Sequence, residues 1–98
     1  MPRPVVLEPW ARADVADAFL WYEQQRPRLG SEFLAEIARV LHAIEQRPEQ
    51  YAIVRSQTRR ALVHRFPYAI LYIIEPNEIA IIAVMHGRRD PQRWQERR

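Results

Sequence analysis

The sequence predicts an α+β fold in which a helical hairpin packs on one face of a twisted antiparallel sheet, in the order β-α-α-β-β-β. Two observations lead to this class. Residues 12–46 repeat apolar side chains every three or four positions, which is typical of amphipathic helices. Residues 61–85 instead contain short continuous runs of aromatic and β-branched residues, which are typical of buried strands.

The first half of the chain is expected to hold one short strand and both helices. Val5–Leu7 lies between two prolines, which favours a strand at a sheet edge. A first helix is predicted from about residue 12 to residue 25, and a second from Pro27 to about residue 46. The residues expected to face the core are Val15, Ala18, Phe19, Tyr22, Phe33, Leu34, Ile37, Val40, Leu41 and Ile44. Those expected to face water are Glu32, Glu36, Arg39 and Glu45.

The second half is expected to form the rest of the sheet. Residues 48–58 are predicted to be a connection, with Tyr51 and Ile53 against the core. A short apolar run follows at residues 61–63. Residues 68–74 and 79–85 are predicted to pair as an antiparallel hairpin, because the four residues between them include a proline and an asparagine that favour a turn. Pro67 cannot donate a hydrogen bond within the sheet and is expected at the start of a strand.

Length and composition limit the classes of protein to consider. The 98 residues are expected to form one domain, residues 1–98, and 48% apolar residues suffice for a core. The absence of cysteine excludes disulfides and thiolate metal sites. No apolar run approaches the ~20 residues that cross a bilayer, and the N-terminus has no signal-peptide pattern. We therefore expect a cytoplasmic protein without membrane segment, metal or cofactor.

Charge is distributed unevenly along the chain. All fifteen basic residues are arginine, so no lysine is available as a general base. Residues 1–54 carry six arginines and eight acids, a net charge of −2, whereas residues 55–98 carry nine arginines and four acids, a net charge of +5. The basic half favours an acidic partner, either a nucleic acid or an acidic protein segment, although a solvated face without a partner has the same composition.

No standard catalytic motif is present, and the three histidines lack the spacing of metal ligands. His86 is the best candidate for chemistry. It ends the last predicted strand just before a glycine and two arginines, where an imidazole could contact phosphate. A structural histidine bonded to backbone is the alternative. Trp94 is expected to pack on the sheet, with stacking on a base as the less favoured role.

The sequence resembles the RelE/ParE superfamily of toxins from type II toxin–antitoxin systems, and within it the ParE-like, plasmid stabilisation branch. Three segments carry the resemblance. The first is Ala13-Asp14-Val15 with Gly30-Ser31-Glu32-Phe33-Leu34. The most specific is Arg59-Arg60-x4-Arg65-Phe66-Pro67-Tyr68-x-Ile70-x-Tyr72. The last is His86-x-Arg88-Arg89-x-Pro91-x2-Trp94.

The resemblance implies a helical hairpin on a twisted sheet and a cognate antitoxin that wraps the toxin. It also implies one of two activities: RelE-like members cut mRNA on the ribosome without metal, and ParE-like members inhibit DNA gyrase. The ribonucleases typically carry basic residues at the positions of Arg60 and Leu62, arginines at Ala69 and Arg88, and a tyrosine at Trp94. This sequence retains Arg60 and Arg88 and differs at the other three positions.

These differences favour a ParE-like gyrase inhibitor that is neutralised by an acidic antitoxin and has no catalytic residues of its own. The residues expected to bind partners are Arg55, Arg60, Arg65, Arg88, Arg89 and Trp94. The alternative is a ribosome-dependent mRNA endonuclease that uses Arg60, His86 and Arg88. A second alternative is an inactive toxin-like protein that only binds antitoxin.

Overall fold

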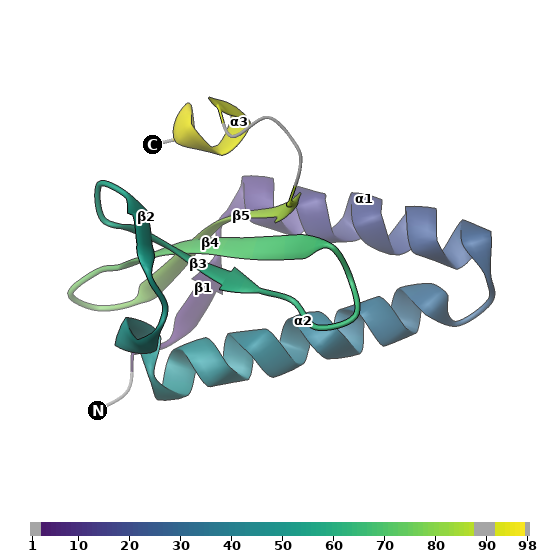
Figure 1. Cartoon of the computed structure of the whole chain (residues 1–98), viewed down its shortest axis with the longest axis horizontal. Helices are drawn as coiled ribbons and strands as arrows, with labels where there is room; N and C mark the ends of the chain where they lie inside the picture. The colour runs from purple at the N-terminus through teal and green to yellow at the C-terminus, as the bar shows by residue number, and fades with distance from the viewer. Residues whose placement is uncertain (1–2, 88–91, 98) are drawn as a thin grey trace.

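The computed structural model of the protein describes residues 3–87 and 92–97 (Figure 1). In chain order the elements are β1 (Val5–Leu7), α1 (Pro9–Gln25), α2 (Leu29–Gln46), the 3-10 turn η1 (Pro48–Gln50), β2 (Ile53–Arg55), β3 (Thr58–Leu62), β4 (Tyr68–Ile74), β5 (Ile79–His86) and α3 (Gln92–Gln95). The predicted helical hairpin and sheet are therefore confirmed. Within these two stretches, no helix is both long and apolar enough to cross a membrane.

The sheet has five strands in the order β1-β5-β4-β3-β2. Strands β3, β4 and β5 are antiparallel neighbours, as predicted, and β2 pairs antiparallel to β3. Strand β1 instead runs parallel to β5, with Val5 opposite Ile79, so the sheet is mixed and the fully antiparallel sheet predicted from sequence is corrected. Parallel pairing requires a long crossover, and the intervening elements supply it. β1 lies at the sheet edge, as its flanking prolines indicated.

Strand β2 lies within residues 48–58, which were predicted to be a connection. It pairs with β3 through a tight turn in which Ser56 has φ of 51°, and the register shifts within the pairing. Ile53 is exposed, contrary to the prediction that it packs on the core, whereas Tyr51 does contact the core. A three-residue strand with a shifted register is too short to show an alternating pattern.

The two helices begin at different residues from those predicted. α1 begins at Pro9, three residues before Arg12, because a proline is well suited to the first helical turn. α2 begins at Leu29 and not at Pro27. Arg28 has φ of 73°, a left-handed conformation that separates Pro27 from the helix and turns the chain back on itself.

A close approach between the helices fixes this turn. A Cβ at Gly30 would lie 2.8 Å from Cδ1 of Phe19, so only glycine fits without movement. The Glu23 carboxylate of α1 accepts hydrogen bonds of 3.0 Å from the backbone N–H groups of Arg28 and Gly30. Glu23 therefore satisfies two amide donors at the start of α2 that the helix itself leaves unbonded.

The main core lies between the helical hairpin and one face of the sheet. The buried residues among those predicted on the helices are Ala18, Phe33, Ile37, Val40 and Ile44, and those predicted on the strands are Ile70, Tyr72, Ile79 and Ile81. Phe19 and Leu41 are only half-buried, and Leu34 is exposed. These three residues lie at the border of the buried helix faces. The spacing of apolar residues indicates which face of a helix is buried, but it does not define how wide that face is.

Glu36 was predicted to face water, but it is only 6% exposed. Its carboxylate is 3.2 Å from Nε of Arg39 and 4.0 Å from a guanidinium nitrogen of Arg65, so the buried charge is paired. Arg65 lies in the turn before β4 and approaches Glu36 from across the core. A buried carboxylate is tolerated only with such partners, and the sequence does not show a contact over this chain separation.

The opposite face of the sheet carries a second, smaller apolar cluster. It consists of Leu71, Ile82, Ala83, Met85 and Trp94. Trp94 comes from α3 and is 9% exposed, which confirms the prediction that it packs on the sheet. The helical hairpin does not cover this face. The five cluster residues are nevertheless at most 9% exposed, whereas Leu62 on the neighbouring strand β3 is open to a partner.

Candidate partner-binding groove on the open sheet face

A groove of about 560 Å³ crosses the sheet face opposite the helical hairpin. It runs over β3, β4 and the end of β5 and is bounded by β2 on one side and α3 on the other. The residues that line it are Val54, Arg55, Arg60, Leu62, Ala69, Leu71, Met85, His86, Gly87, Trp94 and Gln95.

The floor of the groove is apolar because of strand alternation. Ala61 points into the helix-covered core, so its neighbours Arg60 and Leu62 point to the open face. Leu62 lies opposite Ala69, and Arg60 lies opposite Leu71 on β4. Leu62 is 68% exposed, which is unusual for a leucine on a sheet and marks a surface suited to an apolar contact.

The rim of the groove is cationic. Nη1 of Arg55 donates a 2.8 Å hydrogen bond to Oε1 of Gln95, which connects the β2–β3 hairpin to α3. The guanidinium of Arg60 is exposed and has no hydrogen-bonded or ion-paired partner in residues 3–87 and 92–97. None of the described residues that line the groove is acidic. An anionic segment that also carries apolar side chains therefore matches both the floor and the rim.

His86 and Trp94 lie at the end of the groove. His86 is the last residue of β5, as predicted, and its ring lies 5.6 Å from the ring of Tyr68, centroid to centroid. Trp94 forms part of the wall, and its burial leaves little ring surface for stacking on a base. Arg60, His86 and Trp94, which are distant in sequence, are thus brought together by the sheet.

Arg65 is not among the residues that line the groove. Nη2 of Arg65 lies 2.8 Å from Oε1 of Glu32 on α2, and its guanidinium covers the Phe66 ring at 5.4 Å. Hydrogen bonds from Arg65 and Arg26 lower the pKa of Glu32, and the hydrogen bond to Glu32 raises the pKa of Arg65. Arg65 thus joins α2 to the turn before β4. Arg88 and Arg89 lie outside the described residues.

The chemistry available in the groove is mainly that of binding. Attack by a ribose 2′-hydroxyl requires a base, an acid and stabilisation of the phosphorane. Leu62 and Ala69 cannot transfer protons, and Arg60 remains protonated at ordinary pH. His86 is the one titratable side chain among the described residues that line this groove. The groove therefore offers charge and apolar surface more than proton transfer.

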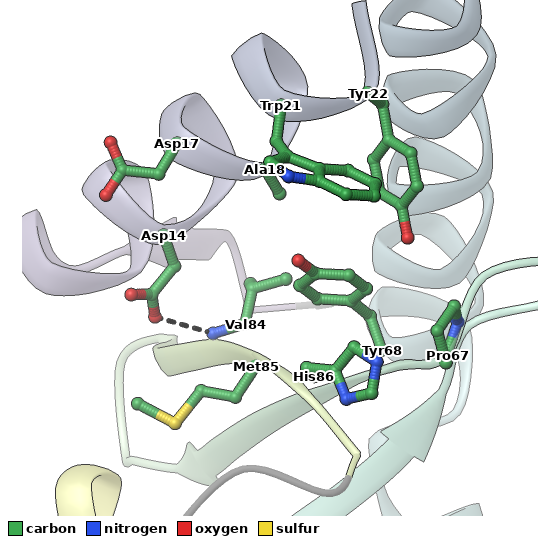
Figure 2. Close-up of a pocket in the computed structure, with 10 residues that line it drawn as sticks. All are labelled: Asp14, Asp17, Ala18, Trp21, Tyr22, Pro67, Tyr68, Val84, Met85 and His86. Atoms are coloured by element: carbon green, nitrogen blue, oxygen red, sulfur yellow. Dashed lines mark hydrogen bonds between the residues drawn. The ribbon is translucent and has the colours of Figure 1, made fainter. Parts of the chain in front are cut away.

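Sequence reasoning missed a second hollow, between α1 and the ends of β4 and β5 (Figure 2). Its walls include Asp14, Asp17, Trp21 and Tyr22 from α1. The signal in the sequence was Trp21, which lies off the buried stripe of α1 and is 56% exposed. An exposed tryptophan beside carboxylates is a candidate binding surface, but the strand residues that complete the hollow follow only from the tertiary structure.

Comparisons with known proteins agree with this architecture. A family model described as "ParE toxin of type II toxin-antitoxin system, parDE" matches residues 5–91. Among solved structures, a chain from "Chromosomal ParDE TA system from P. aeruginosa" is similar with a TM-score of 0.77 and 17% sequence identity, over 86% of this chain and 95% of that chain. At this identity the structural likeness supports the fold alone. Comparison with curated proteins gives no match.

Proposed function

Because the chain belongs to the ParE toxin family of type II toxin–antitoxin systems, we propose that it inhibits DNA gyrase in the cytoplasm by protein–protein binding. The observation that carries this proposal is the composition of the open-face groove. Leu62 and Ala69 lie opposite each other there, at positions where the resemblance places polar catalytic groups in the ribonucleases of the superfamily. A groove without those groups favours binding of a protein target over cleavage of RNA.

A cognate acidic antitoxin is the second proposed partner. The groove combines an apolar floor with the exposed guanidinium of Arg60, and Arg55 lies on the neighbouring strand. Opposite charges across an interface raise the association rate, and salt screens this effect beyond about 8–10 Å. We therefore propose that an acidic segment of the antitoxin enters this groove, with its apolar side chains against Leu62.

The test of the target uses two purified systems in parallel. The protein is added to gyrase with relaxed plasmid, and separately to ribosomes translating a defined mRNA. The proposal expects loss of supercoiling in the first assay and intact mRNA in the second. Cleavage of the mRNA together with unaffected supercoiling would contradict it.

The mRNA endonuclease remains the alternative function, because Arg60 and His86 line the same groove. One imidazole beside one guanidinium could supply proton transfer and charge stabilisation. If the protein cuts mRNA, His86→Ala should abolish cleavage. If the protein instead inhibits gyrase, neither the unchanged protein nor His86→Ala should cleave mRNA.

The antitoxin surface is tested by charge reversal. Arg55→Glu with Arg60→Glu should slow association with the antitoxin and reduce its dependence on salt, because both charges border the groove. The matched control reverses Arg3 and Arg47, which are not among the residues lining the groove. Equal effects from the two pairs, measured by stopped-flow mixing at several salt concentrations, would show that the groove does not face the antitoxin.

A further inference from the structure

The second hollow has the features of a binding site of its own. It encloses about 630 Å³, a volume sufficient for a large side chain. Figure 2 shows Trp21 and Tyr22 extending from α1 on one side, with Tyr68 and His86 on the other. The Tyr22 and Tyr68 rings lie 6.1 Å apart, and the Trp21 and Tyr22 rings meet edge to face at 5.1 Å. Aromatic rings therefore form much of its wall.

The two carboxylates of the hollow differ in their surroundings. Asp14 is saturated: it accepts a 2.9 Å hydrogen bond from the backbone N–H of Val84 and pairs with Arg97 at 2.7 Å and 3.1 Å. Asp17 is exposed and has no hydrogen-bond or ion-pair partner among residues 3–87 and 92–97. Asp17 is therefore the carboxylate in this hollow that is available to a ligand.

The hydroxyl groups of Tyr22 and Tyr68 give the hollow hydrogen-bond acceptors that carry no charge. Burial, with a smaller contribution from Tyr68, raises the pKa of Tyr22 above its ordinary value. The Tyr22 phenol therefore stays neutral at physiological pH. A cation in the hollow would face the negative ring faces of the aromatics and the full charge of Asp17, which together favour a positively charged group.

The chain already contains one example of this arrangement. Trp10 and Asp14 are four residues apart on α1, and residues at this spacing lie on the same helix face. Arg97 binds to this pair: its guanidinium lies 5.3 Å from the centre of the Trp10 ring and forks onto the Asp14 carboxylate.

Asp17 and Trp21 have the same four-residue spacing further along α1, in the reverse order, with the carboxylate first. They offer the same two groups, a carboxylate and an indole, and the tyrosines add further aromatic surface. The difference is that no described side chain of this protein pairs with Asp17. The first pair thus shows which ligand chemistry the second pair suits.

We propose that this hollow binds a guanidinium group, supplied by an arginine side chain of a partner protein. A planar guanidinium stacks on Trp21 while its forked donors reach the Asp17 carboxylate, and a lysine ammonium cannot make both contacts in this way. The proposal does not depend on which partner binds the open-face groove, because the hollow lies on the α1 side of β4 and β5. It adds an acidic, aromatic contact point to a protein whose net charge is +3.

The test uses the full chain and a small probe, so its outcome is independent of gyrase and antitoxin. Nα-acetyl-arginine methylamide is titrated into ¹⁵N-labelled protein while the three tryptophan indole N–H signals are followed by NMR. The Trp21 signal should shift saturably, and the signals of Trp10 and Trp94 should not, because Arg97 already occupies the Asp14 carboxylate beside Trp10 and the sheet buries Trp94. The uncharged citrulline analogue should give no saturable shift.

Two variants complete the experiment. Asp17→Asn should weaken binding of the arginine probe at least fivefold, whereas Glu49→Gln, which removes an exposed carboxylate outside the hollow, should leave binding unchanged. Trp21→Leu, read from the remaining backbone signals around Tyr68, should abolish saturable binding. Equal binding of the citrulline or lysine analogue, or equal binding by Asp17→Asn and the unchanged protein, would overturn the proposal.

Discussion

The ion pair between Asp14 and Arg97 makes a quantitative prediction about stability. It joins α1 to the C-terminal segment across 83 residues of chain. The side chains are 15% and 8% exposed, so water screens them little. Arg97 also donates a 3.0 Å hydrogen bond to the carbonyl of Ile82. We expect Arg97→Met and Asp14→Asn each to lower the free energy of unfolding.

The size of the loss follows from what each variant leaves behind. Removing one partner of a buried pair costs about 3–5 kcal/mol when the other charge stays buried. Here the C-terminal segment can instead detach, which releases the remaining charge to water but exposes Trp94, at about 1.5–3 kcal/mol for a large apolar side chain. We therefore expect about 2–4 kcal/mol for each single variant, and nearly the same loss for the double variant.

Urea unfolding followed by circular dichroism measures these losses, with Asp17→Asn and Arg47→Met as controls for a carboxylate and a guanidinium without ion pairs in the described structure. The coupling energy from the four proteins should be about 2–4 kcal/mol, close to the loss in one single variant, because both singles break the same contact. Losses that add in the double variant, or a coupling energy below about 0.5 kcal/mol, would show that the pair does not hold the C-terminal segment in place.

Three further outcomes are expected from the same unfolding assay. Ile37→Ala should cost about 2–5 kcal/mol because it leaves a cavity in the core, whereas Leu20→Ala on the exposed face of α1 should cost under about 0.5 kcal/mol. Tyr72→Phe should lower the free energy of unfolding by about 1–3 kcal/mol, because the buried hydroxyl donates a hydrogen bond to the carbonyl of Pro48. Burial raises the pKa of Tyr72 to about 12, and the variant should lack this tyrosine titration. Hydrogen bonds from Arg65 and Arg26 lower the pKa of Glu32, so Glu32 contributes its full stabilisation above the ordinary pKa of 4.5 and loses it as the pH falls through the lowered pKa. Glu32→Gln should therefore flatten the dependence of the free energy of unfolding on pH in that range. An unchanged dependence would contradict this.

Much of the fold could be predicted because local pattern and tertiary contact agree over long elements. The helical hairpin has apolar residues at helical spacing, β4 and β5 are continuous runs of strand-forming residues, and the turns between them have suitable residues. The features that were missed depend on distant contacts. The parallel partner of β1 follows from a crossover, and the burial of Glu36 follows from an arginine 29 positions away in the printed sequence. Neither is encoded in a short window of sequence.

The candidate groove was anticipated in part. The charge of the basic half and the family resemblance selected Arg55, Arg60, His86 and Trp94 as candidates, and the structure places all four along one groove, while their roles stay predictions. Arg65 was selected for its charge alone, but its side chain points to α2 and pairs with Glu32 there. The sequence does not show in which direction a side chain points. The hollow beside α1 was missed because its strand residues come from the other half of the chain.

The way the sheet ends beyond β1 has a consequence for self-association. β1 covers only the first part of β5, and the next backbone groups, at Ile82 and Val84, are bonded by side chains from the C-terminal segment and α1. At β1 itself, the Leu7 carbonyl accepts a hydrogen bond from Arg12. Open-ended fibres that grow by adding strands require free edges on both sides of each copy. Side chains therefore occupy part of the β1 side, which disfavours strand addition there, and copies that meet through their β2 edges alone form a closed pair that does not extend into a fibre.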